Sequence, residues 1–216
     1  MRIGRLVLVQ MLLLILLFAG EAGATWTFEL FSGAQYNVPM PLVMRQQGFA
    51  DLSLLGDYES QPFNSPIYYA WRLGKWHGNR GWELEFVHQK LILHNRPDDV
   101  QNFEVSHGYN LLTLNRAWHL YGLHLHVGLG MVITHPESTV RGKTHPGNQG
   151  LFNAGYYISG PTTQVAVGKR FPLWYTLFAT VEGKVTASFA RVPIADGSAD
   201  VPSVALHGLF GLGMNW

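Results

Sequence analysis

The 216-residue sequence predicts an all-β fold, a transmembrane antiparallel up-and-down β-barrel with ten strands favoured and eight as the alternative. Three observations point to this class. The chain begins with an export-type apolar segment, only 13% of its residues are charged, and an alternating pattern continues to its last residue. Because a barrel strand turns one face to lipid and the other to the lumen, it alternates instead of forming a continuous apolar run.

Residues 1–24 have the organisation of a secretory signal peptide. Two arginines precede an apolar run of about 15 residues, and an Ala-Gly-Ala sequence ends it with a small-residue cleavage site. The run is shorter than a membrane-spanning helix of roughly 20 residues, so we favour cleavage after Ala24 over an uncleaved anchor. The domain 25–216 would keep 13 of the 15 basic and 13 of the 14 acidic residues. Its zero formal charge gives no electrostatic reason to expect a nucleic-acid partner.

The rest of the chain reads as strands separated by turns, with β-branched and aromatic residues dominating the strands. The expected strand segments are 25–36, 42–47, 51–59, 66–76, 82–93, 102–115, 122–134, 155–170, 175–191 and 202–216. Bacterial single-chain barrels have even strand numbers, and the short segment 42–47 therefore favours ten over nine. In the eight-strand alternative, segment 25–36 would be a plug or no strand.

The connectors between these segments are of two kinds. The short ones, expected on the side of the C-terminus, are 78–81, 117–122 and 169–174. The longer and more polar ones, expected on the other side, are 60–66, 94–101, 135–154 and 192–202. Short turns at one end and long loops at the other are typical of outer-membrane barrels.

The last strand ends on an aromatic residue with no polar tail. Its lipid-facing register contains Phe210, Leu212, Met214 and Trp216. Together with the signal peptide and the alternating strands, this ending resembles bacterial integral outer-membrane β-barrel proteins. The resemblance is one of architecture and covers the whole of 25–216. It implies a location in the bacterial outer membrane, and it implies that the barrel-assembly machinery reads the C-terminal strand as its signal.

A lumen of eight to ten strands is narrow and is usually filled by side chains. We expect a closed interior network made of Arg72, Glu83, Glu85, Gln89, Glu104, Asn110, His124, His126, Glu182, Lys184 and His207. Buried charges need partners, and the register across the turn 78–81 places Arg72 beside Glu85.

These features predict a monomeric, non-enzymatic membrane protein with a role in membrane integrity, adhesion or surface interaction. Its expected partners are outer-membrane lipids, including lipopolysaccharide, and we expect no cofactor and no metal. The second hypothesis is a hydrolase that modifies lipid A or phospholipid, and the third is a narrow channel.

The hydrolase hypothesis depends on a serine and a histidine that can meet. Some small outer-membrane barrels are lipid A deacylases, in which a histidine lies two residues before the serine on the same face. Here Ser106 and His107 are adjacent, so they point to opposite faces. A weaker set is Ser106, His126 and Glu104. Its expected register separates serine and His126 by about 13 Å, far beyond a hydrogen bond of about 3 Å.

The long connector 135–154 also contains residues that bind ions. His135, Glu137 and His145 match no known metal-site spacing. Arg141 and Lys143 could contact lipopolysaccharide phosphates, although we expect an ordinary solvated loop.

Overall fold

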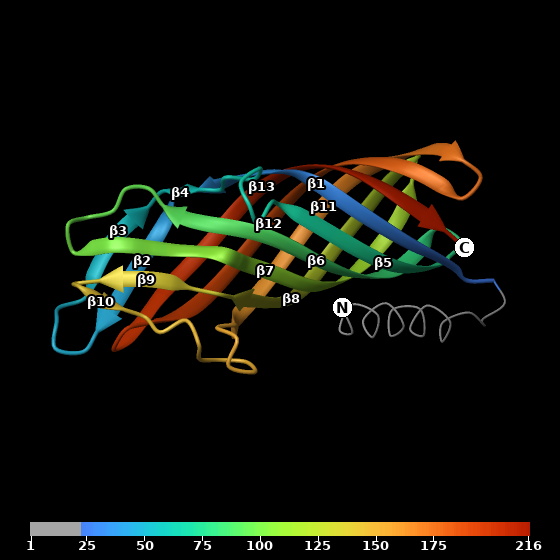
Figure 1. Cartoon of the computed structure of the whole chain (residues 1–216). Coiled ribbons are helices and arrows are strands. Elements are labelled where there is room, and N and C mark those ends of the chain that lie inside the picture. The colour runs from blue at the N-terminus through green and yellow to red at the C-terminus, as the bar shows by residue number, and fades with distance from the viewer. Residues whose placement is uncertain (1–22) are drawn as a thin grey trace.

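Antiparallel strands close into a barrel in the computed structural model, which describes residues 23–216 (Figure 1). The strands are β1 Thr25–Val38, β2 Met40–Gln46, β3 Leu52–Gly56, β4 Tyr58–Glu59, β5 Tyr69–His77, β6 Arg80–Leu93, β7 Val100–Leu120, β8 Leu123–Thr134, β9 Glu137–Val140, β10 Lys143–Thr144, β11 Tyr157–Trp174, β12 Leu177–Ile194 and β13 Gly197–Asn215. In this part of the chain, no helix is long and apolar enough to cross a membrane. The predicted signal peptide falls almost entirely outside the described residues.

The hydrogen-bonded circuit runs through β1, β5, β6, β7, β8, β11, β12 and β13, and returns to β1. Every neighbouring pair is antiparallel, and the closure leaves the circuit without a free edge. The predicted all-β up-and-down barrel is therefore confirmed. The circuit has eight strand positions, which we call columns, and eight is the alternative strand number.

Ten expected segments give eight columns because two columns are each built from two segments. Strands β1 and β2 both pair with β13, where Val38 faces Val204 and Val43 faces Asp200. Similarly, β3 and β4 continue the column of β5, since β3 pairs with β2 and both β4 and β5 pair with β6. The expectation that segment 25–36 would be a plug in an eight-strand barrel is wrong, because β1 pairs on both sides.

The short turns lie at one end of the barrel, and the first and last strands begin and finish at this same end. The backbone groups of Trp26 and Trp216 exchange two hydrogen bonds of 2.9 and 3.0 Å there. Tyr121 and Gly122 both have positive φ, as tight hairpin turns require. The turn expected at 169–174 is instead part of β11, and the chain reverses directly after Trp174.

The connector expected at 192–202 is mostly strand. Strands β12 and β13 extend until only Ala195 and Asp196 remain between them, and Asp196 has a φ of 55°, a conformation that Asp tolerates. The polar residues of this segment indicate a loop when read alone. They fit a strand here because Ser198 and Asp200 lie on the outer face of β13, while Ala199 is buried.

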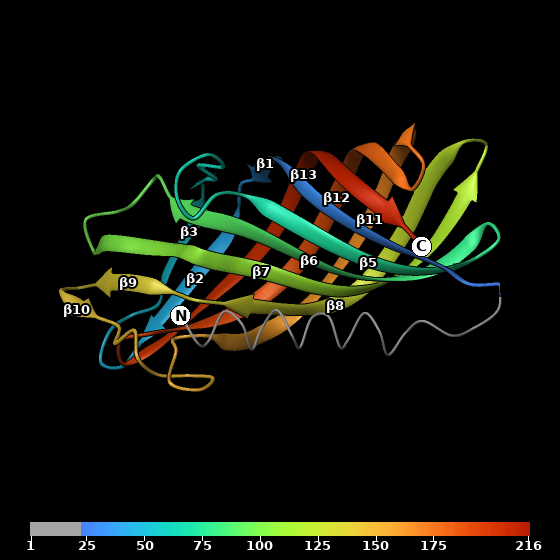
Figure 2. The ribbon, with the colours of Figure 1, turned by 45° about the vertical axis from the view of Figure 1, so that its right-hand side comes forward.

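The two halves of the barrel have opposite polarity. We call the half beside the short turns the turn half. Its inner face holds Glu29, Arg72, Glu83, Glu85, Glu182 and Lys184, and its outer face holds exposed Leu30, Trp82, Leu114, Leu129, Val181, Phe210 and Leu212. We call the opposite half, with β2, β3, β9 and β10, the loop half (Figure 2). Its inner face holds a hydrophobic core that includes Leu42, Met44, Leu91, Leu93, Phe103, Val105, Val192, Ile194 and Val201.

Candidate functional site

Arg72 lies at the centre of a charged layer across the lumen of the turn half. Its Nη2 donates to both carboxylate oxygens of Glu182, at 2.7 and 2.8 Å. Its Nε lies 3.3 Å from Glu85 and 3.7 Å from Glu83, while Nη1 lies 3.5 Å from Glu29. Arg72 and Glu85 are direct partners in the β5–β6 register, as the sequence predicted. One guanidinium therefore bridges four carboxylates from three strands, β1, β6 and β12.

Lys184 and Arg170 supply the other positive charges of this layer. Lys184 Nζ contacts a carboxylate oxygen of Glu85 and lies 3.4 Å from Glu182, and Arg170 Nη2 lies 2.6 Å from Glu29. Apart from Arg170, with 14% of its side chain exposed, the charged side chains of the layer have no exposed surface. Such buried charges are tolerated because each has partners of opposite sign. Together these side chains close the lumen at this level.

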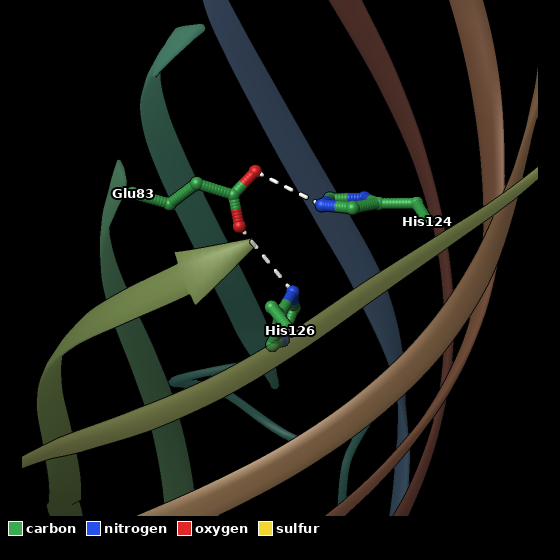
Figure 3. Close-up of side chains that lie close together, drawn as sticks. All are labelled: Glu83, His124 and His126. Atoms are coloured by element: carbon green, nitrogen blue, oxygen red, sulfur yellow. Dashed lines mark ion pairs between the residues drawn. The ribbon is translucent and has the colours of Figure 1, made fainter. Parts of the chain in front are cut away.

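Glu83 of β6 points between two imidazoles of β8 (Figure 3). One of its oxygens lies 3.1 Å from His124 Nε2, and the other lies 3.3 Å from His126 Nδ1. These contacts are ion-pair distances without aligned hydrogen bonds. Two imidazoles and a carboxylate are a possible metal ligand set, but the three residues expose at most 2% of their surface. This triplet is therefore sealed from solvent.

Two more residues of the expected network lie inside the barrel. Gln89 is on the inner face of β6 and is 1% exposed. His207 of β13 bonds through Nδ1 to the Tyr68 hydroxyl at 2.9 Å and through Nε2 to the Thr186 hydroxyl at 3.0 Å. The part of the lumen next to the charged layer is thus also filled by side chains.

Glu104 and Asn110 do not belong to the interior, and here the expectation is corrected. Glu104 is partly exposed and pairs with Glu137 of β9, on the side of β7 opposite to the buried Phe103. Asn110 lies on the same side of β7 as the exposed Leu114. The rule that polar residues face the lumen holds for the turn half. It fails for these two residues because the loop half has an apolar interior.

The weak catalytic set of Ser106, His126 and Glu104 is not assembled. His126 pairs with Ala117, which is eleven residues further along β7 than Ser106, or about 36 Å at 3.3 Å per residue. His126 also points into the lumen, whereas Glu104 lies on the outer face. The expected separation of about 13 Å was too short, because the real β7–β8 register is displaced.

A cleft of about 340 Å³ lies on the outer wall where β5, β6, β7 and β8 meet the segment before β11. Tyr69, Phe86, Ile133 and Tyr156 give it apolar walls. Tyr156 belongs to the segment after β10, which runs back along the outside of the barrel instead of crossing its end (Figure 1). The cleft therefore faces away from the lumen.

His88 is one of two buried polar residues of this cleft, together with Asn110. It is 4% exposed, although it lies on the same face of β6 as the exposed Trp82. Its Nδ1 lies 2.8 Å from Asn110 Oδ1, and its Nε2 has no partner. Gly108 makes this pairing possible, since it has a φ of 128° and a Cβ there would lie 2.3 Å from the Asn110 side chain.

A second polar group lies at the edge of the same cleft. His107 lines the cleft and contacts a carboxylate oxygen of Glu137 through Nδ1. The ring of His135 lies edge-on to His107, with the ring centroids 5.2 Å apart. Burial lowers the pKa of His135, and the neighbouring His107 lowers it further. Sequence reasoning missed this group because its members become neighbours only through the β7–β9 pairing.

His145, also singled out in the sequence, is buried, whereas the basic pair of the same connector and the C-terminal residues lie at the surface. Arg141 pairs with Asp99 at 3.1 Å and Lys143 with Asp196 at 2.6 Å, so both basic residues already have carboxylate partners. In the last strand, Phe210, Leu212, Met214 and Trp216 are 40–65% exposed on the outer face.

No protein-family model and no curated protein matches the chain. Among solved structures, the chain is similar to Ail, the attachment invasion locus protein of Yersinia pestis, in complex with the heparin analogue sucrose octasulfate. The TM-score is 0.41 and the identity 10%, over 89% of this chain and 99% of Ail. It is also similar to Neisserial surface protein A, with a TM-score of 0.39 and 6% identity over 90% of this chain and 98% of the other. Both are small outer-membrane β-barrel proteins. Likenesses this distant say nothing of the function of this chain.

Proposed function

We propose that the protein is an integral outer-membrane β-barrel with a polar, closed interior, and that it acts in membrane integrity, adhesion or surface interaction. The observation that supports this best is the polarity of the turn half. Its inner face carries buried ion pairs, while its outer face carries exposed leucine, valine and aromatic side chains. A water-soluble barrel would have the opposite arrangement.

The apolar outer face of the turn half is suited to hydrocarbon. Leu129 is 70% exposed, Leu212 65% and Phe210 62%, and these residues come from two sides of the barrel. Soluble monomers rarely expose apolar patches of more than a few hundred Å². A closed barrel can place this surface in lipid, because all its backbone ladder bonds are internal.

The filled interior favours a structural role over a channel. The side chains of Arg72, Glu85 and Lys184 have no exposed surface, so no water-filled path passes them in this conformation. The loop half supports a role in surface interaction, because its own apolar core allows it to fold outside lipid and project into water.

The partners we propose are the barrel-assembly machinery, through the C-terminal strand, and outer-membrane lipids. Phe210 and Trp216 face outward at the end of a regular strand, as an assembly signal for the barrel-assembly machinery would require. Lipopolysaccharide would surround the outer leaflet side of the apolar face. We expect the protein to act as a monomer.

Fluorescence quenching tests the proposed membrane position. Trp82 is 53% exposed on the outer face, whereas Trp76 is 3% exposed. Two variants, each with one of these as its only tryptophan, are refolded in vesicles that contain brominated phosphatidylcholine. We expect strong quenching of Trp82 and weak quenching of Trp76. Equal and weak quenching of both would contradict a lipid-facing outer wall.

Planar-bilayer recordings of the same refolded protein test the closed interior. We expect no discrete conductance steps. Steady channel steps in protein that has the electrophoretic mobility of folded barrel would favour the narrow channel instead.

A second candidate is a lipid-modifying hydrolase, and one observation favours it. The outer-wall cleft holds a buried histidine, His88, whose Nδ1 is fixed by Asn110 and whose Nε2 is free. This is the arrangement of an oriented general base on the outer wall of the barrel. The test is mass spectrometry of lipid A after incubation of lipopolysaccharide with the refolded protein and its His88→Ala variant. Loss of an acyl chain with the parent protein alone would establish the hydrolase, and unchanged lipid A with both would exclude this activity.

A further inference from the structure

The bulge in β7 brings a side chain of a type that binds metal ions to the outer wall of the barrel. Gln89 pairs with Tyr109 and Leu91 with Val105, so residues 106–108 lie opposite Lys90 alone. Such bulges redirect side chains at functional sites. Here the bulge carries His107 at the edge of the cleft, beside the start of β9.

His135 is held against His107 by the backbone and by packing. Its N–H donates to the carbonyl oxygen of Gly108 at 3.0 Å. The ring packs on Tyr156, with the centroids 4.9 Å apart, and a Cβ at Gly155 would lie 2.3 Å from its Nε2. Nδ1 of this imidazole is buried and has no hydrogen-bond partner. The His135 ring is therefore held in place by its surroundings, while its Nδ1 atom has no hydrogen-bond partner.

Glu137 completes the set from β9. One donor atom each from His107, His135 and Glu137 lie within 4.8 Å of one another. Two imidazoles and one carboxylate form a known three-ligand set for Zn²⁺, with one coordination position left for another ligand. Bond lengths of about 2.0–2.2 Å require the donors to move closer together, which rotation of the partly exposed His107 and Glu137 side chains permits.

The interior triplet of Glu83, His124 and His126 has the same donor types but a different setting. Its carboxylate also lies among the buried cations of the charged layer, and its members have almost no exposed surface. On the outer wall, the side chains of His107 and Glu137 are 54% and 39% exposed. Only the outer set can exchange an ion with solvent without opening the barrel.

We propose that His107, His135 and Glu137 bind one divalent transition-metal ion, of the class of Zn²⁺, on the outer wall of the barrel. The ion bridges β7 to the start of β9 and lies at the edge of the cleft. Its remaining coordination position takes water or an anionic oxygen. His107 and Glu137 must both be unprotonated to act as ligands.

Titration of the refolded, chelator-treated protein with Zn²⁺ by calorimetry tests the site, with Co²⁺ absorption as a second readout of the ligand set. We expect one equivalent to bind. The variants His135→Ala and Glu137→Gln should each weaken binding by more than about 100-fold, because even outer-shell changes cost about 10–100-fold. Glu137→Gln changes a partly exposed side chain, so it tests the site even if His135→Ala does not fold.

The matched control is His94→Ala. His94 forms a similar exposed pair with Glu59, at 2.9 Å, but it is not part of a three-ligand cluster. This variant should bind one equivalent with unchanged affinity. Absence of binding to the parent protein, or binding that survives both Glu137→Gln and His135→Ala, would overturn the proposal. Loss of binding in His124→Ala alone would place the ion in the interior triplet and also overturn it.

Discussion

In the two halves of this barrel, the same strands place polar and apolar side chains on opposite faces. Along β6, the inward residues change from Glu83 and Glu85 in the turn half to Leu91 and Leu93 in the loop half. The outward residues change in the reverse sense, from the exposed Trp82 and Leu84 to the exposed His94 just after the strand. Strand β6 is continuous from Arg80 to Leu93, so the inversion does not come from a change of secondary structure.

This difference shows what surrounds each half. A face is apolar where it avoids water, and only a lipid environment makes the outside of a barrel the apolar face. The loop half has the ordinary arrangement of a soluble β-protein, and the turn half has the arrangement of a membrane protein. The change of polarity therefore marks, along each strand, where the proposed membrane ends.

The largest expected effect comes from the centre of the charged layer. Arg72→Met leaves Glu29, Glu83, Glu85 and Glu182 without their shared cation, and removal of one partner from a buried pair costs about 3–5 kcal/mol. The measurement is the urea midpoint of unfolding in phospholipid vesicles.

Arg45→Met in the loop half is the matched control for this change. The Arg45 side chain is 45% exposed and pairs with Asp51 and Asp200, and exposed ion pairs contribute about 0–1 kcal/mol. Similar losses in the two variants would mean that the charged layer is not shielded from water, and the comparison of the halves would fail.

A charge on the outer wall distinguishes the halves from outside. Leu129→Arg in the turn half should cost about 2–4 kcal/mol if the side chain lies near the middle of the membrane. Ser53→Arg, on the exposed face of β3 in the loop half, should change stability by no more than about 0.5 kcal/mol. Folding yield and urea midpoint in vesicles are compared for both. A tolerated Leu129→Arg would argue against a lipid-facing wall.

The smallest expected effect is at the surface of the loop half. Asp200→Asn removes the carboxylate that pairs with Arg45 at 2.6 Å and Arg191 at 2.7 Å. We expect a small decrease in melting temperature, measured by circular dichroism at low salt. It should vanish in about 1 M salt, where the screening length is about 3 Å. A salt-independent decrease would indicate that Asp200 is shielded from solvent.

The predictions of which charged residues face the lumen were correct in the turn half and wrong in the loop half. Arg72, Glu85, Glu182 and Lys184 meet inside the barrel as expected, because their strands follow the polar-inward rule. Glu104 was placed inside by the same rule and lies outside, because it belongs to the loop half. The ten-strand expectation failed for a related reason, since an interruption within a column looks in the sequence like a turn between strands.

By itself, the sequence determined the antiparallel barrel and the partner of Arg72, because alternation and a short hairpin are local properties that fix face and register. Only the tertiary structure decided the strand number, the polarity of the loop half and the grouping of His107 with His135 and Glu137. These depend on which distant segments share a column, and on a bulge at Gly108 that no periodicity reveals. Pairing between distant strands is set by closure of the whole sheet, and the residues of one strand do not encode it alone.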